Sequence, residues 1–417
     1  MLDHGAMAGH PGRPASGTAD GPAPAGAAPG LGGPRARAAL LALGALWLAL
    51  GLANVARGLP AVGYDYCRWA YPHRSYSDLL WLFGVHYPGP ARPIPYLQDR
   101  VEYPVLLGLF LWLPALDPGG AAGHLAVSAA LLAACLAAAG WALARLPGAR
   151  PWWLAATPAL VPLAFLNWDL LPVALVALSL LSLERGRAGR AGLLAALGTA
   201  AKLFPAVLVP PALGALAAGP RRPLLRAAAA FALALAAVEL PVALAAFDSW
   251  GWFFRYNAGR GAENSIWHAL GVGPGAALDL LSLGPVAAAG VWAALAARAA
   301  ARRGEDQRAV RLGTALLLVL WIALNKVWSP QYALYGFLAG ALAGAPGWLF
   351  AALSAASIAD YLIEFEVRAR HWEAAFVRRV VIPSEIARTL LWLLLAALVA
   401  RALARAARGP VSSPRTT

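Results

Sequence analysis

Long apolar runs separated by short polar connections recur along nearly the whole chain. Crossing about 30 Å of hydrocarbon takes roughly 20 residues in a helix, whereas a barrel would need short alternating segments. The pattern predicts an all-α polytopic membrane protein with about 12 transmembrane helices. The runs that predict spans lie near Ala38–Ala56, Ala121–Ala144, Trp152–Leu166, Leu170–Leu183, Ala227–Ala246, Gly275–Ala297, Leu312–Leu324, Tyr332–Ala343, Trp348–Ile363 and Ile386–Ala404.

Two apolar stretches do not fit a simple crossing. Pro104–Leu116 holds about 13 residues, too few to span, and therefore predicts an interfacial helix that follows the first span. It lies in a first external loop expected at residues 58–120. Ala191–Ala217 must leave and return to one side, either as two short helices broken near Lys202–Pro205 or as one re-entrant hairpin.

The arginines predict the orientation of the spans. By the positive-inside rule, the arginine-rich connections belong to the cytoplasm, together with both termini. Residues 1–34, rich in Gly, Pro and Ala, predict a disordered cytoplasmic tail; 35–408 is the membrane domain and 409–417 a second cytoplasmic tail. The connections in question are Arg145–Arg150, Arg185–Arg190, Arg221–Arg226, Arg298–Arg311 and Arg401–Arg408.

One stretch resists this rule. The predicted topology places Glu364–Glu385 on the external side of the membrane, yet this stretch carries Arg368, Arg370, Arg378 and Arg379. Either the late topology is off by one crossing, or these arginines serve anionic ligands.

Composition excludes several classes of protein. With 60% hydrophobic and 13% charged residues the chain is no ordinary soluble enzyme. The net charge of +14 comes from arginines between apolar runs, which favours topology signals and contacts with membrane lipids over nucleic acid. Cys67 and Cys135 form no disulfide framework, and the histidines have no metal-ligand spacing. We therefore expect no metal and no cofactor.

Both lysines of the chain, Lys202 and Lys326, lie inside apolar runs, although the other basic residues are all arginine. A cation at membrane depth costs roughly 2.5–3.5 kcal/mol on insertion scales, which makes such a residue a functional candidate by default. A purely structural lysine at this depth still needs a counter-ion.

Under this topology the unusual polar residues gather on the external side. An acid that faces several cations suits transfer of a group from a phosphate leaving group to a hydroxyl, because the acid takes a proton and the cations stabilise the phosphate. The residues are Asp78, Glu102, Tyr103, Asn167, Asp169, Lys202, Arg260, Asn264, Lys326, Ser329 and Gln331.

Each acid also has a structural interpretation. Asp78 can cap the helix that begins at Leu79, and Glu102 can simply start the interfacial helix. Asp169 can pair with a neighbouring loop cation. Asp65 and Asp99 are most simply solvated loop acids or ion-pair partners.

Six short motifs follow one another along the chain: Tyr76-Ser-Asp-Leu79, Pro95-Tyr96, Glu102-Tyr-Pro-Val105, Asn167-Trp-Asp-Leu170, Ala200-Ala-Lys-Leu-Phe-Pro205 and Ser329-Pro-Gln331. Their order along residues 38–405 resembles that of the actinobacterial glycosyltransferase family 87 of the GT-C superfamily, which includes a polyprenyl-phosphate-mannose-dependent α-mannosyltransferase. Where that enzyme has a histidine pair, this chain reads Gln331-Tyr332, which leaves the sugar and the acceptor open.

The resemblance implies a GT-C-type fold in the plasma membrane with an extracytoplasmic active site. It implies a polyprenyl-phosphate sugar donor, mannose by default, a lipid or cell-envelope glycan acceptor, and metal-independent inversion. Asp78 then fits the general base, and Lys202 a donor-phosphate contact. From the residues alone, the donor phosphate can meet Lys202, Arg260 and Lys326. The substrate-binding candidates are Glu102, Tyr103, Asn167, Asp169, Asn264, Ser329 and Gln331.

Three rival functions remain open, as does the oligomeric state. A secondary transporter or lipid-linked-sugar flippase also uses buried Lys and Asp at helix breaks, although near the midplane. A transferase of a non-sugar group lacks its expected metal-binding or His-x₄-Asp motif here. A non-catalytic assembly subunit is favoured if Asp78 lies away from any cavity.

Overall fold

The computed structural model describes residues 33–63, 65–370 and 373–409, and these residues form helices without a β-strand. Nearly all of the two predicted tails, 1–34 and 409–417, lies outside the described residues. Isolated β-bridges join Pro95 to Asp99 and Glu263 to Val327. The prediction of an all-α protein is confirmed.

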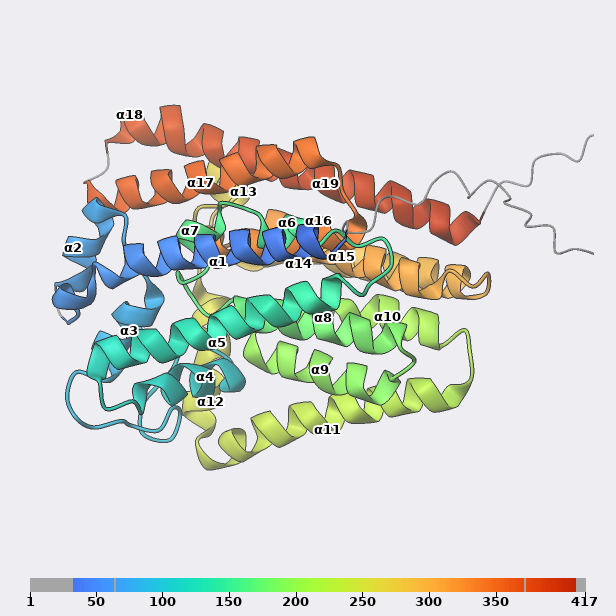
Figure 1. The fold of residues 1–417 in the computed structure, drawn as a ribbon, viewed down its shortest axis with the longest axis horizontal. Coiled ribbons are helices and arrows are strands. Elements are labelled where there is room, and N and C mark those ends of the chain that lie inside the picture. The colour runs from blue at the N-terminus through green and yellow to red at the C-terminus, as the bar shows by residue number, and fades with distance from the viewer. Residues whose placement is uncertain (1–32, 64, 371–372, 410–417) are drawn as a thin grey trace, which may run out of the picture. The chain divides into compact units, whose positions relative to one another are not determined.

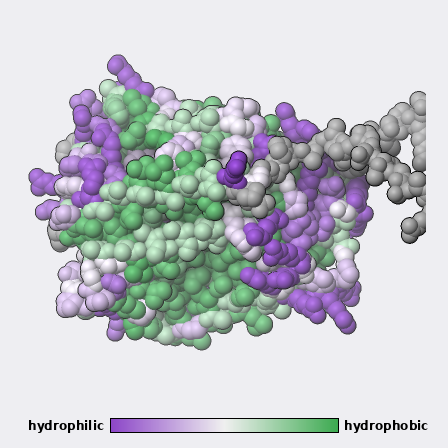
Figure 2. All heavy atoms as spheres, viewed as in Figure 1, coloured by the Kyte–Doolittle hydropathy of each residue, from purple (hydrophilic) through white to green (hydrophobic). Residues whose placement is uncertain are grey.

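Seven segments of the described chain are long and apolar enough to cross a membrane. The chain is therefore a polytopic membrane protein, and Figure 2 shows a broad apolar band between two polar ends of the drawn face. The segments are Ala38–Ala61, which contains most of α1 (Pro34–Ala56), α5 (Gly120–Leu143), α11 (Arg221–Ala245), α14 (Ala276–Ala301), α15 (Asp306–Leu324), α17 (Gly347–Ala369) and Ala374–Arg408, which contains α18 (Ala374–Phe376) and α19 (Ile382–Arg408).

The sequence predicted about twelve transmembrane helices, and the structure has seven segments long enough to span. Several of the other predicted spans coincide with shorter helices. By length alone they do not qualify as spans, so the count of about twelve stays a prediction. The short helix predicted at Pro104–Leu116 is present as α4 (Val105–Ala115), and its interfacial position stays a prediction. The others are α8 (Leu170–Glu184), α9 (Ala188–Ala201), α10 (Val209–Leu216) and α16 (Ala333–Ala343).

The span expected at Trp152–Leu166 is wrong as a continuous helix. The segment contains two single turns, α6 (Trp152–Ala155) and α7 (Leu160–Leu163). Pro158 lies between them and has no N–H to continue the first turn. The buried Thr157 hydroxyl, 3.0 Å from that of Ser354, anchors the break to α17.

The predicted break near Lys202–Pro205 is present. Helix α9 ends at Ala201, Lys202 is extended with φ −153° and ψ 142°, and a 3₁₀ turn over Phe204–Leu208 leads into α10. Pro205 favours this stop because it has no N–H to donate to the carbonyl of Ala201, four residues earlier, and its ring would clash with that carbonyl in a continued helix.

The arginine-rich connections gather at one end of the helices, on the right in Figure 1. They join α5 to α6, α8 to α9, α10 to α11 and α14 to α15, and the last turns of α19 lie beside them. The opposite end carries α2 (Tyr66–His73), α3 (Asp78–His86) and α18. This clustering agrees with the predicted grouping of the arginine-rich loops.

Local ion pairs account for two of the four arginines that resisted the orientation rule. Arg368 lies one turn from Glu364 and pairs with it at 2.5 Å, and Arg370 pairs with Glu366. Glu366 also binds Arg74 of the loop after α2. These arginines therefore have carboxylate partners at the end opposite the other arginine-rich loops.

Candidate active site

Asp78 is the first residue of α3, and Ser77 is the residue that caps this helix. The Ser77 hydroxyl accepts a hydrogen bond from the Leu79 N–H at 3.2 Å and donates to the Phe165 carbonyl. The capping interpretation of Asp78 is therefore wrong, and its carboxylate is free for other partners. The Asp78 N–H donates to Leu166 O at 2.8 Å, which ties α3 to the segment before α8.

The Asp78 carboxylate accepts two side-chain hydrogen bonds. The Tyr76 hydroxyl donates to Oδ1 at 2.7 Å and the Asn167 amide donates to Oδ2 at 2.6 Å. Asn167 also donates to the Tyr103 hydroxyl at 2.9 Å. Burial raises the pKa of Asp78 above its usual range, against the opposing effect of these hydrogen bonds and of the Lys202 charge.

Glu102 is a second half-buried acid in the same region. Burial raises its pKa, and the negative charge of Asp78 raises it further, so the two carboxylates interact electrostatically. Acids whose pKa values are shifted upward near neutral polar groups are typical of catalytic sites.

Lys202 and Asp169 form a buried ion pair. Lys202 Nζ lies 2.7 and 2.8 Å from the two Asp169 oxygens, and the Tyr335 hydroxyl donates to Asp169 Oδ1 at 2.6 Å. Asp169 is fully buried and Lys202 is 8% exposed. Asp169 is thus the counter-ion that a lysine at this depth requires, as the ion-pair interpretation of Asp169 proposed.

Aromatic rings join the ion pair to the Asp78 group. Lys202 Nζ lies 5.9 Å from the centre of the Tyr103 ring and 5.6 Å from that of Tyr332. Because Tyr103 also accepts from Asn167, the two sets of side chains form one polar cluster. Tyr76, Tyr332 and Tyr335 were missed as site residues. Tyr76 and Tyr332 lie in motifs that the sequence analysis quoted, whereas a tyrosine hydroxyl in an apolar segment was the only signal for Tyr335.

Arg260 and Lys326 come together on a short pair of loop segments. Glu263 N–H donates to Lys326 O and Trp328 N–H donates to Glu263 O, both at 2.9 Å. Arg260 Nε donates to Glu263 Oε1 at 2.9 Å, and Lys326 Nζ donates to Asp279 Oδ1 at 2.8 Å. Both acids are about half exposed, with side-chain accessibilities of 49% and 45%.

Three further candidates, Asn264, Ser329 and Gln331, form side-chain hydrogen bonds with residues other than those of the Asp78 cluster. Asn264, with φ +51°, donates to Glu364 Oε2 at 2.6 Å. Ser329 donates to Gln331 Oε1 at 2.7 Å, so these two residues bind each other.

A buried group that the sequence reasoning missed holds the Asn264 loop. Arg388 of α19 donates to Asn264 O and pairs with Asp360 of α17, which also accepts from Trp328 Nε1 at 2.7 Å. Arg388 and Asp360 are charges inside apolar helices. The rule that singled out the two lysines would have found them too.

Two apolar cavities of the described chain lie away from the acid cluster, one among α8–α11 and one lined by α10, α14 and α15. Within the described residues, no three His, Cys, Asp or Glu side chains converge as metal ligands.

Comparison with known families agrees with a polytopic membrane enzyme that transfers a sugar. The family model described as glycosyltransferase family 87 matches residues 102–324, more than half of the chain. The chain belongs to glycosyltransferase family 87. Searches of the curated proteins and of the solved structures gave no match, so the GT-C-type arrangement stays a prediction.

The matched range contains most of the candidate cluster but not its proposed base. Glu102, Tyr103, Asn167, Asp169, Lys202, Arg260 and Asn264 lie within it. Asp78, Lys326, Ser329 and Gln331 lie outside it.

Proposed function

We propose that the protein transfers a hexose, by default mannose, from a polyprenyl-phosphate donor to a hydroxyl of a lipid or cell-envelope glycan. The observation that carries this proposal is the Asp78 carboxylate, held by Tyr76 and Asn167 and raised in pKa by burial, in a chain of glycosyltransferase family 87. The active site then faces the extracytoplasmic side of the plasma membrane, opposite the arginine-rich end, and both termini are cytoplasmic.

In the proposed reaction the acceptor hydroxyl attacks the anomeric carbon from the face opposite the phosphate. The new bond joins that carbon to the acceptor oxygen, and the bond to the phosphate oxygen breaks, which inverts the configuration. Asp78 takes the hydroxyl proton, and polyprenyl phosphate leaves with the bonding electron pair. Such a general base contributes about 10²–10⁴-fold in rate.

Arg260 and Lys326 are the stronger candidates for the donor phosphate. Their partners Glu263 and Asp279 are half exposed, so water can solvate those acids when a phosphate takes over the cation. Lys202 has its charge neutralised by an acid with no exposure. We therefore propose that Lys202 acts on the donor phosphate mainly indirectly, by positioning Asp169 and Tyr103. The alternative is that Lys202 contacts the phosphate directly.

The remaining candidates are proposed to surround the sugar and acceptor. Asn167 binds Asp78 and Tyr103 binds Asn167, so both can orient the Asp78 carboxylate. The charge of Glu102 interacts with that of Asp78. Ser329, Gln331 and Asn264 come from the same loops as Lys326 and Arg260. We propose that they contact the donor or acceptor rather than take part in proton transfer.

The test uses purified protein in lipid nanodiscs with labelled polyprenyl-phosphate mannose, polyprenyl-phosphate glucose or decaprenyl-phosphate arabinose, and a membrane lipid extract as acceptor. Asp78→Asn should abolish transfer while folding and donor binding persist. The matched control Asp65→Asn changes an exposed acid of the same loop and should leave transfer unchanged. Addition of EDTA should leave the rate unchanged, because the proposed displacement needs no metal.

A fully active, well-folded Asp78→Asn protein would remove Asp78 as the base, and Glu102→Gln would then be the next variant to measure. Absence of transfer from every donor by a folded wild-type protein would favour a transporter, a flippase or a non-catalytic subunit.

A further inference from the structure

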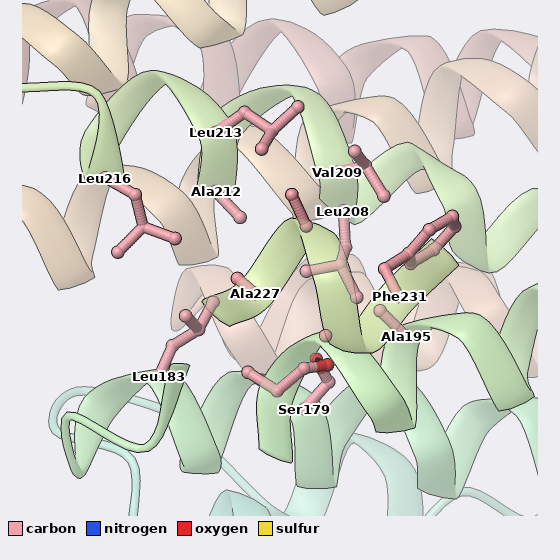
Figure 3. Close-up of a pocket in the computed structure, with 13 residues that line it drawn as sticks. Ser179, Leu183, Ala195, Leu208, Val209, Ala212, Leu213, Leu216, Ala227 and Phe231 are labelled. Atoms are coloured by element: carbon pink, nitrogen blue, oxygen red, sulfur yellow. Dashed lines mark hydrogen bonds between the residues drawn. The ribbon is translucent and has the colours of Figure 1, made fainter. Parts of the chain in front are cut away.

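A second site lies among the helices near the arginine-rich end. A cavity of about 150 Å³ is lined by residues of α8, α9, α10 and α11, and Figure 3 shows almost entirely apolar side chains around it. An apolar cavity of roughly this size stays dry and takes a benzene-sized group. It can therefore hold part of a hydrocarbon chain.

Two helices that line this cavity pack closely, and the lining has no free side-chain polar group. A Cβ on Gly192 of α9 would lie 2.1 Å from Ala227 O of α11, so the two backbones pack in direct contact there. The one hydroxyl in the lining, that of Ser179, donates to Ala191 O at 2.8 Å and is satisfied. Leu213 and Ala228, on α10 and α11, line the cavity yet are exposed, and they mark its opening toward the surrounding lipid.

Two arginines stand beside this lining at the arginine-rich end. Arg190 precedes Ala191 on α9, and Arg226 precedes Ala227 on α11; both are exposed. The helices approach closely there, because a Cβ on Gly189 would lie 3.8 Å from Arg226 O. Among the described residues, neither arginine forms an ion pair or a side-chain hydrogen bond.

Two other charged groups near this end have partners of their own. Glu184, at the end of α8, pairs with Arg311 at 3.1 Å. Arg145 stacks on Trp141, with the guanidinium 4.2 Å from the ring centre. Arg190 and Arg226 therefore present two positive charges next to an apolar opening.

We propose that this site binds one anionic glycerophospholipid, with an acyl chain in the cavity and its phosphate between Arg190 and Arg226. Guanidinium groups bind phosphate oxygens in pairs, and basic pockets between membrane helices bind anionic headgroups. The site is separate from the proposed donor site, because Arg190 precedes Lys202 by 12 positions, about 18 Å of helix. The inference does not depend on the identity of the transferred group.

The experiment titrates delipidated protein in detergent with phosphatidylglycerol, and with phosphatidylcholine as a zwitterionic control. Bound lipid is counted by native mass spectrometry, and the shift in unfolding temperature is followed in parallel. The double variant Arg190→Gln/Arg226→Gln is compared with Arg302→Gln/Arg401→Gln, which removes equal charge from exposed positions outside the cavity lining. Ala228→Phe narrows the opening without changing charge.

We expect one tightly bound phosphatidylglycerol, weakened about five-fold for each arginine removed from the site. Ala228→Phe should lower the affinity as well, whereas the charge-matched control should bind as the wild type does. Equal binding of phosphatidylcholine, or unchanged binding by the double variant, overturns the headgroup assignment. Unchanged binding by Ala228→Phe overturns the acyl-chain assignment. Displacement of the lipid by stoichiometric polyprenyl phosphate would reassign the cavity to the donor's chain.

Discussion

Removing Lys202 alone should destabilise the protein more than removing Lys202 and Asp169 together. Lys202→Met leaves the Asp169 carboxylate, which has no solvent exposure, without its cation. Asp169→Asn leaves the ammonium without its acid but keeps an oxygen that can accept from Tyr335. The double variant leaves neither charge buried and unpaired.

The magnitude follows from the burial of both partners. Breaking a buried ion pair by removing one member costs about 3–5 kcal/mol, whereas replacing both members by uncharged groups of similar size is often nearly neutral. We therefore expect each single variant to lose about 3–5 kcal/mol of unfolding free energy. The double variant should lose clearly less than either, which gives a coupling energy of about 3 kcal/mol or more.

The assay is a double-mutant cycle on detergent-solubilised protein, with unfolding followed by denaturant titration, and with donor titrations on each variant that remains folded. Additive losses in stability would refute the assignment of Lys202 and Asp169 as mutual counter-ions. A stable Lys202→Met protein with strongly weakened donor binding would refute the positioning role and make Lys202 a direct phosphate ligand.

Three further predictions concern the base, the phosphate contact and the packing. Transfer should fall as pH drops through the raised pKa of Asp78, because a base must be deprotonated. Stability linked to Asp78 should instead be lost as pH rises through that pKa, and this dependence of stability should vanish in Asp78→Asn. Arg260→Gln should weaken donor binding by tenfold or more at little cost in stability, whereas Arg255→Gln, an exposed change on α12 (Phe247–Gly259), should leave it unchanged. Gly336→Ala should lower unfolding free energy by about 1–3 kcal/mol, since its Cβ would lie 2.2 Å from the Trp392 ring; unchanged stability would contradict this packing.

The sequence pattern was informative where local chemistry decides the structure. Pro205 and the apolar flanks of Lys202 were enough to predict the helix break, and α4 lies where the short run 104–116 was expected. The pattern failed at Thr157-Pro158, where the apolar run is continuous but the helix is not. Pro158 cannot continue the first turn, and the Thr157 hydroxyl contacts that of Ser354, about two hundred positions later, which the apolar pattern does not indicate.

The candidate site was predictable in its residue types but not in its partners. Asp279 and Lys326 are 47 positions apart, and neither apolar pattern nor motif order indicates that they meet. Arg388 and Asp360 meet only because α17 packs on α19. Ion pairs of this kind depend on tertiary packing, so a single sequence indicates which charges need partners without indicating which partners they find.

The spacing of the ion pairs also has a consequence for biogenesis. At synthesis rates of about 5–20 residues per second, Lys202 follows Asp169, 33 positions earlier, by roughly 2–7 seconds. Arg311 follows Glu184, 127 positions earlier, only after roughly 6–25 seconds. Asp169, whose partner is synthesised soon after it, is fully buried. Glu184, whose side chain is 21% exposed, can stay hydrated until Arg311 has been synthesised. Helices α8 and α9 therefore form a unit that can enter the membrane with its buried charge already neutralised.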